Sequence, residues 1–122
     1  MIGYVMVGTN KFDEATAFYD ALLGTLGATR LMESDAFVAW GTSMGSPSIS
    51  VCKPADGNPA TVGNGVMVAI ALDSKEKVDA LYAKAIELGA TDEGEPGPRG
   101  DTFYAGYFRD LDGNKLNAFF FG

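Results

Sequence analysis

Two stretches of the sequence repeat each other, and this repeat constrains the fold more than any other feature. The segment FYDALLGTLGA (18–28) aligns with LYAKAIELGA (81–90) at an offset of 63 residues, which falls to 62 after one deletion. In both places the segment follows an apolar, β-prone run, at 2–8 and at 66–72. A match at the same place in the same order of elements indicates an internal duplication. We therefore expect two copies of one small folding unit.

The remaining pattern predicts how each copy folds. Apolar side chains at helical spacing follow each apolar run, which predicts helices over about 11–26 and 74–88. Asn10, with Asp13 three residues later, resembles a capping box at the start of the first helix, and Asp73 or Ser74 is expected to cap the second. Further β-prone runs predict strands, which lie in the first half at 28–33, 36–42 and 47–53 and in the second half at 103–110 and 115–121.

Glycine and proline mark the breaks between these elements. The stretch TDEGEPGPRGD (91–101) is rich in both, so we expect a loop here and a weak, broken second strand in this half. A tight Asp112-Gly113 turn is expected to join the last two strands. Asp110 and Asp112 look like an acid pair, but aspartate at such positions is typical of turn geometry. The stretch PADGNPATVGNG (54–65) has little to bury and predicts a linker.

The fold class that follows is α+β, with two small mixed sheets and a helix on one face of each. A chain of 122 residues suffices for one ordinary core, so we expect a single domain over 1–122. Its βαβββ repeats would span 1–54 and 64–122 and be joined by the linker 55–63. The other face of each sheet is not polar enough to lie bare in water. We therefore expect the half-sheets to curl into a cupped mixed sheet with the helices on its outer face, or a partner to cover them.

Residue alternation assigns side chains to the two faces of each strand. In the first strand Val5 and Val7 would pack beneath the helix, while Tyr4 and Met6 would lie on the opposite face. The same alternation places five further residues on the faces away from the helices, namely Ser50, Cys52, Met67, Asn117 and Phe119.

The complete absence of histidine restricts the chemistry of this chain. It excludes Ser-His-Asp and Cys-His catalysis and histidine-based zinc, iron or nickel sites. A single cysteine, Cys52, leaves no intramolecular disulfide, and a reducing, cytoplasmic setting is expected. The net charge of −7, with nine scattered basic residues, argues against nucleic-acid binding. No apolar run approaches the length of a membrane span, and the N-terminus carries no secretory pattern.

Taken with the duplication, three motifs resemble one superfamily. They are FYDALLGTLGA after the first strand, the GNG-hydrophobic run that opens the second half, and DLDGNKLNAF at the end. Together they resemble the vicinal oxygen chelate superfamily, which includes glyoxalase I, extradiol dioxygenases, fosfomycin-resistance enzymes and bleomycin-resistance proteins. The resemblance covers residues 2–121. It implies a cup made by two half-sheets, closed with help from a homodimer partner and holding a divalent metal at its base.

The resemblance also implies where that metal would be bound. The four ligand positions of the family fall on Tyr4, Ser50, Met67 and Asn117 of this sequence. None of these is a usual ligand of a divalent metal, because protonated Tyr and Ser bind such metals poorly, Met suits copper(I), and Asn offers only a carbonyl. We therefore expect no metal cofactor, and the metal-dependent chemistry of the family is not expected here.

Two reactive side chains near the expected cup each have two interpretations. The Cys52 thiol either fills space or is a nucleophile, and a nucleophile would need Lys53, Arg99 or Arg109 to lower its pKa. Arg99, in the GPRG segment, either clamps an anionic ligand over the cup or forms a surface salt bridge. The rings of the last hairpin, with Tyr4, Met6 and Met67, would line an apolar pocket or form a dimer contact.

Two functions from different classes follow. The first is a metal-free binding protein, a bleomycin-resistance-like homodimer whose apolar cup takes a small aromatic or drug-like molecule. The cup would be lined by Tyr4, Met6, Met67, Asn117 and Phe119, with Arg99 able to close over it. The second is a glyoxalase- or dioxygenase-related enzyme that acts on a small electrophilic metabolite through hydrogen-bond donors. Binding tolerates the loss of all metal ligands, whereas the chemistry of those enzymes does not, so the first hypothesis is favoured.

Overall fold

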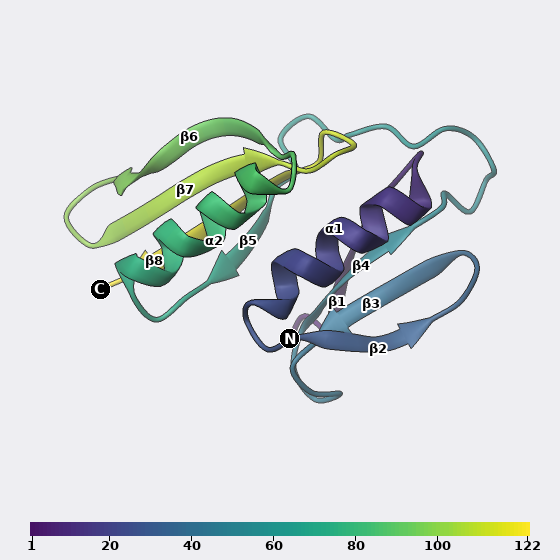
Figure 1. Cartoon of the computed structure of the whole chain (residues 1–122), viewed down its shortest axis with the longest axis horizontal. Coiled ribbons are helices and arrows are strands. Elements are labelled where there is room, and N and C mark those ends of the chain that lie inside the picture. The colour runs from purple at the N-terminus through teal and green to yellow at the C-terminus, as the bar shows by residue number, and fades with distance from the viewer. The chain divides into compact units, whose positions relative to one another are not determined.

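The computed structural model describes residues 1–122 and divides them into two compact units, Met1–Val62 and Gly63–Gly122. Each unit contains one helix and four strands (Figure 1). Unit 1 consists of β1 (Tyr4–Gly8), α1 (Phe12–Gly24), β2 (Thr29–Glu33), β3 (Phe37–Gly41) and β4 (Ser48–Cys52). Unit 2 consists of β5 (Val68–Ala71), α2 (Lys75–Glu87), β6 (Thr91–Pro98), β7 (Phe103–Arg109) and β8 (Lys115–Phe121). The α+β class and the two βαβββ modules are confirmed.

The two sheets have the same strand order, which is what a duplicated unit requires. Unit 1 has the order β1-β4-β3-β2 and unit 2 the order β5-β8-β7-β6. In each sheet the first and last strands of the unit pair in parallel, and the other neighbours pair antiparallel. The helix that follows the first strand provides the crossover that a parallel pair needs.

In unit 1, helix α1 packs on one face of the sheet through an apolar stripe that includes Phe18, Tyr19 and Leu22. Trp40 of β3 is buried beneath the helix, and its ring lies 5.5 Å from that of Tyr19. The Trp40 Nε1 donates a hydrogen bond of 2.7 Å to Asp20 on the helix, which satisfies the one polar atom of this buried ring.

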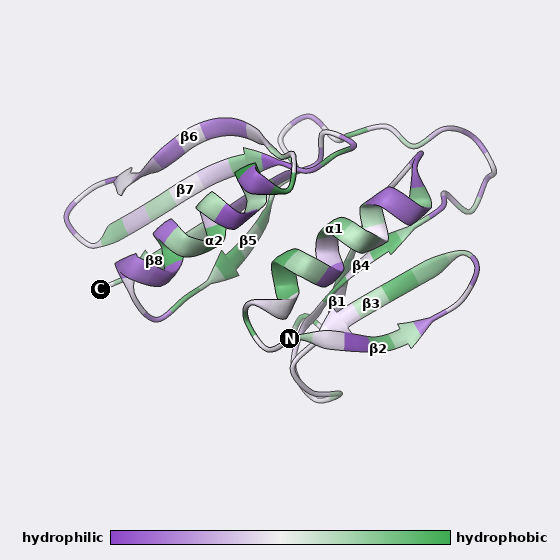
Figure 2. Cartoon of the chain, in the orientation of Figure 1, coloured by the Kyte–Doolittle hydropathy of each residue, from purple (hydrophilic) through white to green (hydrophobic).

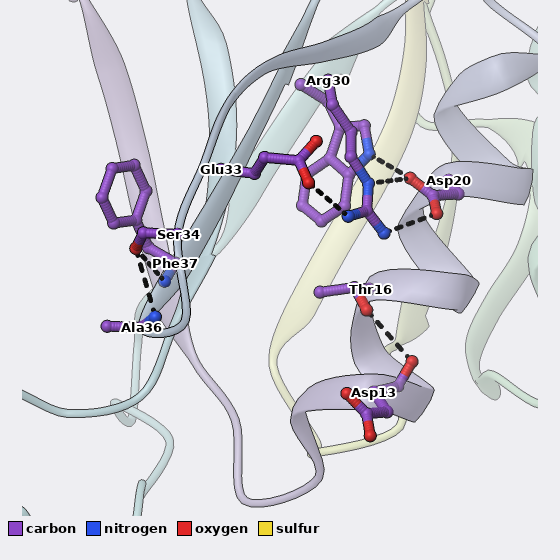
Figure 3. A network of polar contacts seen from close by, with 9 residues as sticks. Asp13, Thr16, Asp20, Arg30, Glu33, Ser34, Ala36 and Phe37 are labelled. Atoms are coloured by element: carbon purple, nitrogen blue, oxygen red, sulfur yellow. Dashed lines mark hydrogen bonds and ion pairs between the residues drawn. The ribbon is translucent and has the colours of Figure 1, made fainter.

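Asp20 also joins helix α1 to strand β2. Arg30 donates two parallel hydrogen bonds to its carboxylate, from Nε at 2.9 Å and from Nη2 at 2.8 Å (Figure 3). The guanidinium fork suits a carboxylate, so this bidentate pair fixes the helix against the edge strand. The hydrogen bonds from Arg30, and to a smaller extent the one from Trp40, lower the pKa of Asp20.

In unit 2, helix α2 buries Val78, Leu81 and Ala85 against the sheet, where Phe108 and Leu116 are fully buried. The helix begins after Ser74, whose hydroxyl accepts a hydrogen bond of 3.2 Å from the backbone N–H of Lys77. Of the two cap residues expected from the sequence, Ser74 is therefore the one that caps.

The cap expected for α1 is wrong. The residue before this helix is Lys11, and no side chain caps its N-terminus. Asn10 instead holds the segment that follows β4: its Nδ2 donates to the Ala60 carbonyl at 2.9 Å, and its Oδ1 accepts from the Ala60 N–H at 2.6 Å. The amide is thus engaged by a backbone group fifty residues away and is not available to the helix.

The loop expected over 91–101 is wrong for most of its length, because residues Thr91–Pro98 form the eight-residue strand β6, which is the second strand expected in this half. Its pairing with β7 shifts register around Gly94, which is why the strand accommodates so much glycine and proline. The Tyr82 hydroxyl of α2 donates a hydrogen bond of 2.6 Å to Asp92 and ties the strand to the helix. Figure 2 shows that β6 is mostly hydrophilic, so hydropathy gave no signal of a strand here.

The turn between β7 and β8 forms as the sequence predicts. Asp110 is buried, and its Oδ1 accepts hydrogen bonds of 2.9 Å from the backbone N–H groups of Asp112 and Asn114. Gly113 follows with φ of 92°, a conformation that favours glycine. Neither helix of the chain is long and apolar enough to cross a membrane.

Candidate functional site

The predicted site residues of unit 1 lie on the sheet face that helix α1 does not cover. Met6 of β1 is opposite Ser50 of β4, and Ser50 is opposite Ala39 of β3, which alternates with the helix-facing Trp40. Tyr4 is on the same face as Met6, two residues earlier in β1. We call this the non-helix face of unit 1. Strands β1 and β4 therefore bring together Tyr4, Met6, Ser50 and Cys52.

This face has a small, buried centre and a large, exposed edge. Ser50 is buried, whereas Tyr4 is 64% exposed and Met6 is 46% exposed. Met32 of β2, opposite Ala39, is also exposed. Methionine is flexible and polarisable, so these side chains suit contact with apolar groups of varied shape.

Cys52 lies at the end of β4, opposite Phe37 of β3, and is half-buried. Burial raises the pKa of its thiol above the ordinary value. No lysine or arginine contributes to lowering that pKa. The thiol is therefore protonated at neutral pH, which supports the space-filling interpretation over the nucleophile.

Two of the predicted site residues of unit 2, Asn117 and Phe119, lie on the face of its sheet that helix α2 does not cover. Asn117 of β8 is paired with Ala69 of β5 on one side and with Tyr107 of β7 on the other. Phe119 follows two residues later on the same face. Met67 lies just before β5 and outside the sheet, and is 41% exposed. We call this the non-helix face of unit 2.

Asn117 is the most unusual polar residue of the chain. Its side chain is only 1% exposed, and its Oδ1 is buried without a hydrogen-bond partner. Leaving a buried acceptor unpaired costs about 1–3 kcal/mol. Buried polar atoms without a partner are rare in proteins, and a donor on a bound ligand is one way to satisfy this one.

Phe119 belongs to a cluster of rings beside Asn117. Its ring stacks on Phe103 of β7, with centroids 5.4 Å apart, and Phe103 in turn meets Phe121 edge-on at 5.9 Å. Offset and edge-on pairs of this kind are the favoured arrangements of aromatic rings. They give the non-helix face of unit 2 a flat, apolar side.

Arg99 follows β6 and folds back over the same face. Its guanidinium carbon lies 5.4 Å from the centre of the Tyr107 ring, and its Nη2 donates to the Glu95 carbonyl at 2.8 Å. Arg99 forms no ion pair with Asp or Glu; the nearby Glu93 is paired with Arg109 at 2.9 Å. The surface salt bridge considered for Arg99 is therefore not formed.

Two residues of this face were not singled out from the sequence, Tyr107 and Lys115. The Lys115 Nζ lies 5.6 Å from the centre of the Tyr107 ring, so one ring carries two cations. Alternation along 103–110 already places Tyr107 on the face of Asn117, and this signal could have found it. The position of the two cations depends on packing, which no sequence pattern encodes.

The residues present do not fit the divalent metal that the family resemblance implies. Tyr4 and Ser50 offer hydroxyl groups, Met67 a thioether and Asn117 a carbonyl, and none of these is an anionic ligand at neutral pH. No three His, Cys, Asp or Glu side chains come together in a group that could hold a metal ion. Each of these side chains, taken by itself, can offer only a hydrogen bond or an apolar contact.

Comparison with known proteins agrees with this fold. The model of the Glyoxalase/Bleomycin resistance protein/Dioxygenase superfamily matches residues 1–118. The crystal structure of a glyoxalase/bleomycin resistance protein from Albidiferax ferrireducens T118 is similar, with a TM-score of 0.90 and 39% identity, covering 100% of this chain and 99% of that one. Among curated proteins no significant match was found.

More distant structures share the fold alone. A family enzyme from Burkholderia phytofirmans PsJN has a TM-score of 0.80 and 22% identity, with 98% of each chain covered. A lactoylglutathione lyase from Agrobacterium tumefaciens has a TM-score of 0.72 and 18% identity, covering 98% of this chain and 92% of that one. The family match over nearly the whole chain and the 39% identical structure establish that this chain belongs to the glyoxalase/bleomycin resistance protein/dioxygenase superfamily.

Proposed function

We propose that the chain is a metal-free binding protein of the bleomycin-resistance type, which takes a small aromatic or drug-like molecule against the non-helix faces of its sheets. The observation that carries this proposal is the buried Oδ1 of Asn117, which has no hydrogen-bond partner. An acceptor of this kind, on a face that also carries the Phe103–Phe119 stack, suits a ligand with a hydrogen-bond donor and a flat apolar body.

The composition of the non-helix face of unit 1 supports the same proposal. Tyr4 and Met6 have large, mostly apolar side chains that are exposed. Ser50, on strand β4 beside them, is small and buried. Soluble proteins rarely leave contiguous apolar surface uncovered unless it binds something. Tyr4 also offers a phenol that both donates and accepts hydrogen bonds.

A homodimer is part of this proposal. The same exposed side chains that suit a ligand also suit a second copy of the chain, and the two uses can share residues. The family match is compatible with this arrangement, which remains a proposal for this protein.

The alternative is a glyoxalase- or dioxygenase-related enzyme acting on a small electrophilic metabolite. Such an enzyme would depend on Tyr4, Ser50, Arg99 and Asn117 as hydrogen-bonding groups. The raised pKa of Cys52 removes the obvious nucleophile, and the donor set offers nothing that activates water as a metal would. Binding therefore has the better support.

Native mass spectrometry of protein purified from cells tests the proposal, because it weighs whatever is bound. We expect an adduct of a few hundred daltons without metal. A thermal-shift screen of planar aromatic, cationic and carboxylate compounds then supplies ligands for titration against wild type and Asn117→Leu. Compounds that carry a hydrogen-bond donor should bind Asn117→Leu about ten- to a hundredfold more weakly than they bind wild type. Equal affinity for both proteins would refute the proposal, and turnover of a hit would favour the enzyme.

A further inference from the structure

We propose that the non-helix face of unit 2 selects a planar carboxylate, whose anionic group is held by Arg99 and Lys115 beside the Tyr107 ring and whose polar substituent donates to Asn117. These four residues are called the Tyr107 subsite. The inference rests on the proposed binding function and names the class of ligand. The charge of the inferred ligand differs from the one that the net charge of −7 suggests, because an acidic chain is expected to favour cationic ligands.

The two cations of the subsite are the first argument. The guanidinium of Arg99 and the ammonium of Lys115 lie 5.4 and 5.6 Å from the centre of one ring. Neither forms an ion pair, although the chain has 16 acidic residues. Four of the other basic side chains are paired with carboxylates, namely Arg30, Lys77, Lys84 and Arg109. Two cations over one ring, neither with a carboxylate partner, favour an anion from solution.

The way in which Arg99 is held is the second argument. Its Nη1 donates to the Pro98 carbonyl at 3.3 Å and its Nη2 to the Glu95 carbonyl at 2.8 Å. A guanidinium has five N–H groups, so three remain to bind a ligand. The bonds to backbone carbonyls fix its orientation in advance, which lowers the entropic cost of binding.

Strand β6 is shaped to let this guanidinium lie close. A Cβ added at Gly94 would lie 3.3 Å from the Arg99 Nη2, and one added at Gly97 would lie 3.2 Å from the Nη1. Both distances are tighter than ordinary contacts, so glycine makes the close approach possible. The register of β6 against β7 shifts at these same two glycines. The irregular strand therefore builds a cradle for Arg99.

Asn117 is the neighbour of the Tyr107 ring in the sheet. It is directly opposite Tyr107 across the β7–β8 pair, and such residues have Cβ atoms about 4.5–5.5 Å apart. Lys115 lies two residues before Asn117 on the same face. The ligand that we infer is a single aromatic ring with a carboxylate at the end near the cations and a hydroxyl or amino group directed at Asn117. A planar carboxylate also matches the flat fork of arginine.

Titration calorimetry with three probes tests the inference. 4-Hydroxybenzoate has both groups, benzoate lacks the donor, and 4-hydroxybenzyl alcohol lacks the charge. We expect 4-hydroxybenzoate to bind wild type about tenfold or more tightly than either other probe. Benzoate cannot donate to Asn117, and 4-hydroxybenzyl alcohol cannot form the charged hydrogen bond to the cations. The affinity of 4-hydroxybenzoate should also fall with added salt, whereas that of the neutral alcohol should not.

Variants identify the residues responsible. Arg99→Gln and Lys115→Gln should each remove most of the advantage of 4-hydroxybenzoate over the alcohol. Lys75→Gln is the matched control, because the Lys75 Nζ lies 5.7 Å over the Tyr104 ring in the same unit, and Tyr104 binds Asp79 of α2 rather than facing the subsite. Asn117→Leu should weaken 4-hydroxybenzoate about tenfold and leave benzoate unchanged.

The possible failures are distinguishable. If the alcohol binds as tightly as 4-hydroxybenzoate, or if Arg99→Gln and Lys115→Gln behave like Lys75→Gln, the carboxylate inference is wrong while ligand binding on this face stands. If none of the probes binds but other planar compounds from the thermal-shift screen do, the inference is again wrong. If no planar compound of any charge binds the folded protein, the proposed function fails with it.

Discussion

Asn117 and Tyr107 lie directly opposite each other across the β7–β8 pair, on the face that helix α2 does not cover. One side chain offers a buried acceptor without a partner, and the other is a ring with two cations over it. The pair therefore joins the two kinds of recognition, hydrogen bonding and charge, on neighbouring positions of one sheet.

The first prediction separates stability from binding at Asn117. Asn117→Leu removes a buried acceptor that is not satisfied in the free protein, so we expect the free energy of unfolding to stay equal or rise by about 1 kcal/mol. Urea unfolding followed by circular dichroism measures this. Loss of more than about 1 kcal/mol would show that the carboxamide supports the fold rather than a ligand.

The second prediction concerns metal content. We expect protein purified without a tag to contain far less than one Ni, Zn, Fe or Mn per chain, because Tyr4, Ser50, Met67 and Asn117 are poor donors for these ions. Elemental analysis before and after chelation gives the content. A content of nearly one metal ion per chain that persists after chelation would show that other side chains form a metal site.

The third prediction is that Asp20 makes unit 1 sensitive to acid. Its pKa is lowered by Arg30 and Trp40, so its contribution is present above the unfolded pKa of about 4 and is lost as pH falls through the lower folded value. Asp20→Asn should cost about 1 kcal/mol at pH 7, because the neutral amide can still accept from Trp40 but loses the charge and the second acceptor oxygen that bind Arg30, in an ion pair that is partly exposed and screened.

The difference between Asp20→Asn and wild type should shrink as the pH falls through the lowered folded-state pKa of Asp20, because its carboxyl then becomes neutral. Asp73→Asn serves as the control, because Asp73 forms only an exposed pair with Lys77 on α2. Its effect at pH 7 should be no more than a few tenths of a kcal/mol. Equal losses in the two variants would contradict the role assigned to Asp20.

The fourth prediction is a homodimer. Sedimentation at micromolar concentration should give a particle of about 26 kDa, twice the 12.8 kDa chain. The exposed Tyr4 and Met6 supply apolar contact area, so Met6→Lys should shift the equilibrium toward the monomer. A 13 kDa particle from the wild-type protein would remove the dimer from the proposal.

The fifth prediction is that Cys52 is unreactive in the folded protein. Burial raises the pKa of the thiol, so alkylation by iodoacetamide at pH 7.5 should be slower than in protein unfolded by urea. Cys52→Ser should bind ligands as well as wild type does. Rapid alkylation of the folded protein, or loss of binding in this variant, would support the interpretation of Cys52 as a nucleophile.

The sequence predicts the elements of this chain well because its apolar periodicity is strong. Helix α1 was expected over 11–26 and forms at Phe12–Gly24, and the β7–β8 hairpin forms around the expected turn. The failures have identifiable physical causes. The Asn10 amide binds Ala60, a contact fifty residues away that no local pattern contains. Strand β6 was not expected over its full length because it contains glycines, at positions where a side chain would crowd Arg99.

The candidate site was only partly predictable for the same reason. Alternation indicates which side chains share a face with Asn117, and the structure places Phe119 there together with Tyr107. Whether a buried oxygen finds a partner, or which ring a cation covers, depends on three-dimensional packing. Those facts distinguish Asn117 and Lys115 from other polar residues of the strands.

The exposure of the methionines has a consequence for how this protein ages under oxidative stress. All five are exposed, including Met6 and Met32 on one sheet face, whereas the thiol of Cys52 is half-buried and protonated. Peroxide would therefore convert thioethers to sulfoxides before it touched the cysteine. Each sulfoxide replaces an apolar group with a polar one, so the non-helix face of unit 1 would become less apolar while the core stayed intact. Because sulfoxide reductases reverse that lesion, the damage would be repairable.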